Sequence, residues 1–346
     1  MSDNDWTLYP NGASKGAPIF FAILLTGLGS YQIYQSFFRY KWKYFGGTIT
    51  WATTVWISGF ICRIISIYHD QEIGLYIAQF VLVLMGPPLY AASEYFILGR
   101  LMAYLPYHAP MHPGRVLSTF FLLSTVVEVL TANGASRSAG KNRTLSERQV
   151  GLALLKAALI VQCFIEALFF SLVVTMERRC RRAKSFPRKV RVVCYVLYLT
   201  SFMMLVRCIV RTIGGFEDSK CNPENPLCGY ITLNEWVMYV FEIANITLFV
   251  IVLAVFHPGR FLPRDDKIYL DPVDNETERL GPGFSKADKR PLWTTVLDPF
   301  NLTGILSGKG MVVRKFWEEQ NPVYNGQELR PSETGASTAE RAAAVK

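Results

Sequence analysis

The sequence has few charged side chains for its length. Asp, Glu, Lys and Arg make up 18% of its 346 residues, whereas about 25% is usual for soluble domains. Hydrophobic residues make up 51%, and most of the charge lies after residue 257 or in short gaps between long apolar runs. This partition excludes an ordinary soluble domain, and we expect no nucleic-acid partner.

Signals for metal, nucleotide or catalytic chemistry are also scarce. The chain has four His and seven scattered Cys residues, which do not suggest a metal site. The stretch 304–309 resembles a phosphate-binding loop, but it is one residue short and Gly310 stands where a hydroxyl residue is needed. No nucleophile lies beside an obvious base. We therefore expect no metal, no cofactor, no ATP-driven pump and no enzyme.

Long apolar runs dominate what remains. A helix needs about 20 apolar residues to cross a bilayer, and seven runs reach that length, at 17–38, 46–68, 74–99, 115–136, 151–176, 190–213 and 233–256. The sequence thus predicts an all-α, polytopic membrane protein, a bundle of seven transmembrane helices. Residues 1–16 form a short extracellular N-terminus, 17–257 the seven-helix domain, and 258–346 a cytosolic tail whose polar composition predicts that it is largely disordered.

Basic residues in the loops predict the orientation. Alternate loops and the start of the tail hold fifteen Lys and Arg residues on one side of the predicted bundle, against six on the other. Cytoplasmic loops carry the excess of Lys and Arg, so the N-terminus is predicted to be outside and the C-terminus inside. The basic stretch 178–189 is expected to bind anionic membrane lipids.

Two features of the predicted outer loops are consistent with this orientation. Cys221 and Cys228 lie in one polar loop, where they either form a disulfide or remain free thiols. Asn142 begins a glycosylation sequon in another outer loop. The sequence leaves open whether the disulfide forms and whether Asn142 is glycosylated.

Charged residues inside the predicted spans are the candidate functional residues, because charge in hydrocarbon is costly. Arg207 and Arg211 share a face of the sixth span, and Glu235 and Glu242 share a face of the seventh. Arg211 and Glu235 are expected at shallow depth, and Arg207 and Glu242 deeper. With Arg63 they predict an outward-facing polar cluster. It is a set of ion pairs that holds the helices together, a site for a zwitterionic or charged lipid headgroup, or a group of side chains that snorkel to the membrane interface.

Three further carboxylates lie within the predicted spans. Glu128 and Glu166 are near mid-membrane, where they act either as proton carriers or as neutral, hydrogen-bonded core residues. Glu94 is expected to pair with Arg100 at the cytosolic interface. Gly86, Pro87 and Pro88 interrupt the third span and predict a kink or a break there.

The chain resembles the fungal RTA1-like family, also called lipid-translocating exporters. The resemblance covers about residues 15–265 and rests on GFICR (59–63), GPPLYAASEYFILGR (86–100), RCIVR (207–211), NEWVMYVFE (234–242) and FHPGR (256–260). Among family positions it matches Arg63, Arg100, Arg207, Arg211, Glu235 and Glu242. It departs at Gly214, where the family has an acidic residue, and at Ser124, Thr125 and Glu128 in the fourth span.

This resemblance implies seven spans and a plasma-membrane or endomembrane location, of which we favour the plasma membrane. It also implies movement of a sphingoid base or a phospholipid-like amphiphile, or resistance to amphiphilic toxins. We therefore expect a lipid or amphiphile translocator without its own ATPase. The alternatives are a seven-helix receptor or sensor, a regulator of lipid asymmetry and, last, an intramembrane enzyme.

Overall fold

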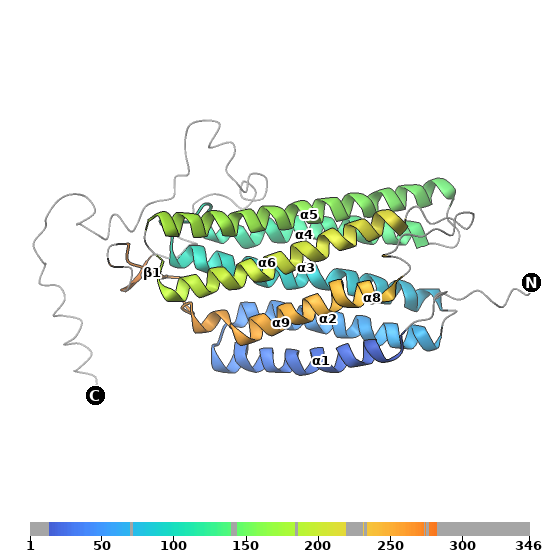
Figure 1. The fold of residues 1–346 in the computed structure, drawn as a ribbon, viewed down its shortest axis with the longest axis horizontal. Helices are drawn as coiled ribbons and strands as arrows, with labels where there is room; N and C mark the ends of the chain where they lie inside the picture. Colours follow the sequence, from blue (N-terminus) through green and yellow to red (C-terminus); the bar gives the residue numbers. More distant parts are fainter. Residues whose placement is uncertain are drawn as a thin grey trace, which may run out of the picture.

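The structure is a computed structural model that describes residues 14–69, 72–139, 144–183, 186–218, 231, 234–272, 274 and 277–281. Within these residues the chain forms an elongated bundle of long, roughly parallel helices (Figure 1). We call the end of the bundle where α8 begins the α8 end, and the opposite end, which carries the strand β1, the β1 end.

Seven helical segments of the described chain are long and apolar enough to cross a membrane, as the sequence predicted. The first consists of α1 (Gly16–Ile33) and the π-helix η1 (Tyr34–Arg39). The last consists of α8 (Glu235–Met238), the π-helix η2 (Tyr239–Ala244) and α9 (Asn245–Val255). The other five are α2 (Lys43–Tyr68), α3 (Ile73–Tyr104), α4 (Pro113–Ala139), α5 (Leu145–Arg182) and α6 (Arg188–Asp218).

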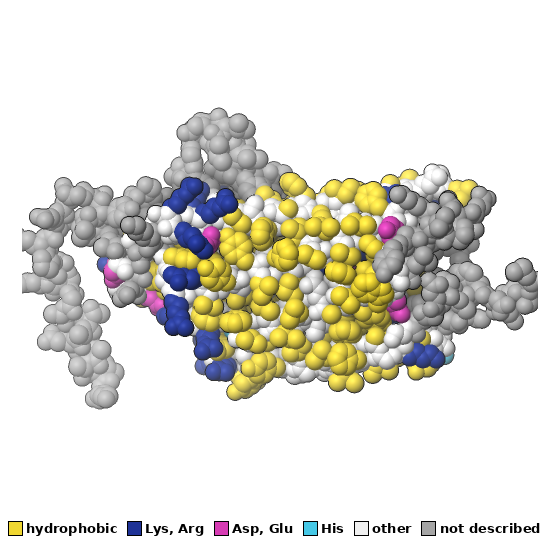
Figure 2. All heavy atoms as spheres, viewed as in Figure 1, with side chains coloured by type: hydrophobic (Ala, Val, Ile, Leu, Met, Phe, Trp, Pro, Cys, Tyr) yellow, Lys and Arg dark blue, Asp and Glu magenta, His cyan; other side chains and the backbone are white. Residues whose placement is uncertain are grey.

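The surface of the bundle is apolar over most of its length (Figure 2). Large hydrophobic side chains such as Phe20, Trp51 and Phe164 are exposed there, which suits a surface that faces lipid. Lys and Arg side chains gather in a band at the β1 end. The exposed apolar belt and the seven helices establish a multi-pass membrane protein. The band of basic residues lies where the N-out orientation predicts the cytosol, and the orientation itself stays a prediction.

Helices that follow one another in sequence also pack side by side. Contacts join α1 to α2, α2 to α3, α3 to α4, α4 to α5 and α5 to α6, while α9 packs against both α1 and α6. The last span thereby brings the beginning of the bundle next to its sixth helix. This arrangement places charged residues of α2, α6 and the seventh span within reach of one another.

The third helix runs without a break through Gly86, Pro87 and Pro88. A proline ring removes the hydrogen bond to the carbonyl four residues earlier, and for Pro87 that carbonyl belongs to Val83. The buried indole of Trp56 on α2 donates its Nε1–H to the Val83 oxygen at 2.9 Å. A neighbouring helix therefore satisfies the freed carbonyl, which explains why α3 continues through the prolines.

Ordered structure extends past the predicted boundary at residue 257. The 3₁₀ helix η3 (Pro258–Arg260) is followed by strands β1 (Ile268–Leu270) and β2 (Glu278–Leu280), which pair antiparallel with Ile268 opposite Leu280. The Tyr104 hydroxyl donates to Glu278 Oε1 at 3.0 Å, so the hairpin is attached to the end of α3. The predicted tail is thus folded in its described first part, and residues 282–346 lie outside the described residues.

Candidate functional site

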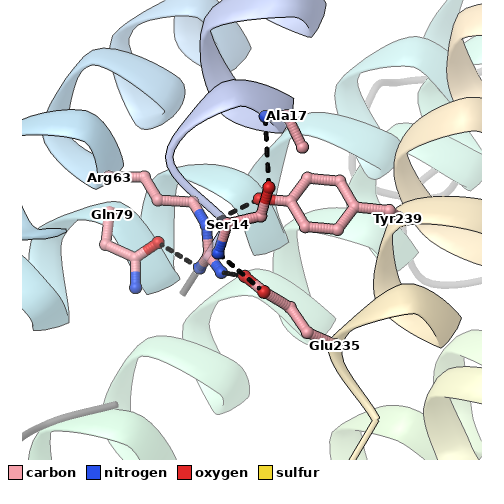
Figure 3. Close-up of polar contacts among 6 residues, drawn as sticks. All are labelled: Ser14, Ala17, Arg63, Gln79, Glu235 and Tyr239. Carbon is pink, nitrogen blue, oxygen red and sulfur yellow. Dashed lines mark hydrogen bonds and ion pairs between the residues drawn. The ribbon is translucent and has the colours of Figure 1, made fainter. Parts of the chain in front are cut away.

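A polar cluster lies inside the α8 end of the bundle, where α2, α3 and the seventh span meet. Arg63, on α2, is buried and donates from Nη2 to Glu235 Oε1 at 2.5 Å, from Nη1 to Gln79 Oε1 at 3.2 Å and from Nε to the Tyr239 hydroxyl at 3.3 Å (Figure 3). The backbone N–H of Ser14 donates to the second Glu235 oxygen at 3.0 Å. One guanidinium thus joins three helices, and Glu235 also holds the start of α1.

A second ion pair is buried more completely. Arg207 Nη2 on α6 lies 2.8 Å from Glu242 Oε1 in the π-helix η2, and the two side chains are 1% and 8% exposed. Both charges are therefore removed from lipid as well as from water. The Nε and Nη1 atoms of Arg207 have no hydrogen-bond partner among the described residues. The pair is tight, but the guanidinium still has unused donors.

The π-helix explains why the two glutamates reach different helices. Seven residues apart on a regular α-helix, Glu235 and Glu242 were predicted to share a face. The wider turn of η2 between Tyr239 and Ala244 changes that register. Glu235 consequently turns to α2 and Glu242 to α6. Arg207 and Glu242, which were predicted at the same depth, form an ion pair, whereas the partner of Glu235 is Arg63 and not Arg211.

Arg211 lies one helical turn beyond Arg207 and forms no ion pair with any described residue. Its guanidinium sits 5.2 Å from the centre of the Phe80 ring. It lines a cavity between α3, α4, α5 and α6. Arg211 therefore presents its guanidinium to this cavity with no described carboxylate in direct contact.

The two mid-membrane carboxylates, Glu166 and Glu128, differ in burial and in their neighbours. Glu166 on α5 is 3% exposed and is an electrostatic neighbour of Arg207, with Oε2 left without a described hydrogen-bond partner. Glu128 on α4 is partly buried and forms no hydrogen bond or ion pair within the described chain. Neither position distinguishes the proton carrier from the neutral core residue, so both interpretations stay predictions.

The expected pair between Glu94 and Arg100 does not form. Arg100 donates instead to the backbone oxygen of Arg264 at 2.9 Å, beyond the last span. Glu94 is fully buried, and neither of its carboxylate oxygens has a hydrogen-bond partner in the described part of the chain. The six-residue spacing places the two side chains on different faces of α3, because such residues lie about 120° apart around a helix.

Sequence reasoning missed Gln79 and Tyr239, which also accept hydrogen bonds from Arg63. Gln79 was detectable as a lone amide in an apolar run, and Tyr239 lies one turn after Glu235. Cys221, Cys228 and Asn142 lie outside the described residues. So do two residues of the basic stretch 178–189, whose predicted lipid contacts remain a prediction.

Arg63 is expected to contribute more to stability than Glu235. Arg63→Ala removes three hydrogen bonds from a buried position, and charged hydrogen bonds contribute about 1.5–3 kcal/mol each. Glu235→Ala removes only one of these partners, so Arg63 keeps its bonds to Gln79 and Tyr239. Water can also enter the place of a carboxylate whose side chain is 28% exposed. Thermal unfolding of the purified variants in one detergent checks this order. A larger loss for Glu235→Ala would contradict the structure.

Together, the apolar belt and the buried charges define a seven-helix membrane protein with a polar interior at one end. The profile of the family described as RTA1 like protein matches residues 49–265, which include every charged residue of this interior. The chain belongs to the RTA1-like family.

Curated relatives come from fungi. The lipid-translocating exporter-like protein RTA1 of Leptosphaeria maculans is 32% identical over 83% of this chain and 57% of its own length. A protein of the same name from Ajellomyces capsulatus is 29% identical over 68% of this chain and 74% of its own. Protoporphyrin uptake protein 1 of Saccharomyces cerevisiae is 29% identical over 57% and 63%. The chain thus spans little more than half of the Leptosphaeria protein. No solved structure matches.

Proposed function

We propose that the protein moves an amphiphile, a sphingoid base or a phospholipid-like molecule, across the plasma membrane without an ATPase of its own. It carries out no chemical conversion of that molecule. One observation carries the proposal: two arginine–glutamate pairs and a further arginine lie inside one end of a lipid-facing bundle. The names of the two exporter-like relatives support the same class of cargo.

The chemistry of the cluster suits a lipid headgroup. Arginines bind phosphate and carboxylate groups through paired N–H donors, and glutamates attract the ammonium groups of long-chain bases. Because the predicted orientation places the α8 end outside, the headgroup would be held near the outer leaflet while its chains stay beside the apolar helices. Export would then relieve cells of toxic amphiphiles.

The direct test follows fluorescent sphingoid bases and phospholipids in fungal cells that lack or overexpress the protein. Export should slow in the first strain and accelerate in the second. Unchanged export of every probe in both strains would exclude translocation. A parallel strain that overexpresses an unrelated seven-helix protein controls for effects that overexpression of any membrane protein has on lipid export.

Glu242→Gln is expected to reduce export while the protein still folds and reaches the membrane. The amide keeps the shape and can accept one hydrogen bond from Arg207, so the bundle retains most of this contact. The charge that balances Arg207 disappears, which changes how the arginine binds a headgroup. Export is measured at equal surface abundance. Equal export by the variant and the wild type at equal surface abundance would show that the carboxylate serves neither binding nor transport.

A receptor or sensor, or a regulator of lipid asymmetry, is the second candidate, favoured by the docked segment after the last span. Besides its bond to Tyr104, Glu278 lies 4.0 Å from Lys189 at the start of α6, so the segment contacts two helices that reach the polar cluster. Deleting residues 268–346, which removes the docked hairpin together with the rest of the tail, separates the alternatives. Full export activity after this deletion favours a translocator, and loss of a cellular response with intact export favours a sensor.

A further inference from the structure

A cavity of about 230 Å³ lies between α3, α4, α5 and α6 at the α8 end of the bundle. Its walls are mostly apolar, with Phe80 and Leu84 from α3 facing Leu152, Leu155 and Leu159 from α5. It does not include Arg63, Arg207, Glu235 or Glu242. We call it the four-helix cavity, and it is a site separate from the two ion pairs.

Arg211 is the charged residue among the described residues that line this cavity. No described carboxylate lies within ion-pair distance of it, since Arg63 is paired with Glu235 and Arg207 with Glu242. Glu242 also interacts electrostatically with Arg211, but its hydrogen bond is to Arg207, so the Arg211 guanidinium has no carboxylate in direct contact. An arginine within a membrane-spanning helix is costly without a partner. A negative group in the cavity would supply that partner.

The size of the cavity indicates which part of a molecule it holds. Sites that enclose a whole small molecule usually measure about 300–1,000 Å³, so this one accommodates a headgroup with the first part of a chain. The leucines of α5 provide an apolar wall for that chain. A free inorganic anion gains nothing from such walls, whereas an amphiphile gains free energy from burying its methylenes.

We propose that the four-helix cavity binds an anionic amphiphile, with a carboxylate or phosphate on the Arg211 guanidinium and the adjoining chain against Leu152, Leu155 and Leu159. This inference rests on the proposed function and narrows its cargo. A long-chain amine would bring a second positive charge next to Arg211. The cavity therefore selects anionic over cationic amphiphiles of the same chain length.

Binding is tested with the purified full chain in nanodiscs of zwitterionic lipid. The probes are a pyrene-labelled fatty acid, the alkyl phosphate with the same labelled chain, and the matched alcohol and amine. The two anionic probes should bind, and the alcohol and amine should bind about 10- to 100-fold more weakly, the range expected for loss of a charged hydrogen bond. Acetate and inorganic phosphate at equal concentration should not displace them.

Three variants locate the site. Arg211→Gln should weaken binding of the anionic probes about 10- to 100-fold and leave the alcohol unchanged. Arg211→Lys should restore part of the affinity, because the charge remains while the planar fork is lost. Ala135→Leu adds bulk to the lining and should weaken all probes that insert a chain. Lys156→Gln is the matched control, since Lys156 stacks on Phe216 outside the lining and its charge should not matter.

Each outcome bears on the proposal. Equal binding of the acid and the amine, or equal loss in Arg211→Gln and Lys156→Gln, would overturn it. So would displacement of the fatty acid by acetate, which would indicate an anion site without a chain. Translocation of the amine by wild-type protein in liposomes, with no binding of either anionic probe, would overturn this inference and leave the proposed function standing. Translocation of no probe would count against the proposed function itself.

Discussion

Replacing Arg207 with alanine is expected to destabilise the bundle by about 3–5 kcal/mol, the cost typical of removing one partner from a buried ion pair. The Arg207 side chain is 1% exposed and its partner Glu242 is 8% exposed, so the carboxylate left behind has no access to water. The variant should show a lower melting temperature in detergent and reduced abundance in cells. An unchanged melting temperature would refute the importance of the pair.

Two control variants show whether the loss of stability in Arg207→Ala comes from the burial of the pair or from the loss of a charge alone. Lys189→Ala breaks an ion pair with Glu278 in which the lysine side chain is 64% and the glutamate side chain 41% exposed. Exposed pairs of this kind contribute only about 0–1 kcal/mol. The double variant Arg207→Met with Glu242→Leu replaces the buried pair by apolar side chains. It should regain most of the lost stability, because the unused donors of Arg207 disappear along with the unpaired charge. If the pair also serves transport, this stable variant should remain inactive.

Gly86→Ala is expected to cost about 3 kcal/mol, near the upper end of typical overpacking effects. A Cβ atom at Gly86 would lie 2.0 Å from Cδ1 of Trp56, far inside contact distance. The indole cannot easily move, because it is fully buried and its N–H satisfies the Val83 carbonyl freed by Pro87. Displacing it would therefore both strain the packing and unpair a backbone oxygen within the membrane. Thermal unfolding in detergent measures the loss.

Gly74→Ala provides the matched control in the same helix. A Cβ there meets nothing within 4 Å, so the change should be neutral or slightly stabilising, as alanine favours helix by about 1 kcal/mol over glycine. Trp56→Phe tests the other half of the contact: it removes the indole N–H and should make α3 less stable around Pro87. Equal stability of Gly86→Ala and Gly74→Ala would contradict the close approach of α2 and α3.

Much of the fold was predictable because a membrane-spanning helix needs a long apolar run, which is easier to recognise in a sequence than the core of a soluble domain. Each span must cover the hydrocarbon with apolar side chains and satisfy its backbone internally. The seven predicted runs therefore coincide with the seven long helices. The charged residues of the family motifs also lie close together, since Arg63 pairs with Glu235 and Arg207 with Glu242 in the polar interior.

What the sequence did not determine is which charges pair. A regular helix predicts a shared face for Glu235 and Glu242, but the π-helix between them turns one toward α2 and the other toward α6. A local pattern does not reveal such a turn, because π-helices are rare and occur mostly as single turns within otherwise regular α-helices. The position of Glu94, buried away from Arg100, likewise depends on how α3 is rotated within the bundle.

By itself, then, the sequence determined the number of crossings, the helical class and the set of charged residues held in the membrane, because these follow from transfer of side chains into hydrocarbon. Only the tertiary structure decided that four of those charges close into two pairs and that Arg211 faces a cavity. The physical reason is that pairing depends on distances of a few ångströms between different helices, which hydropathy along one chain does not specify.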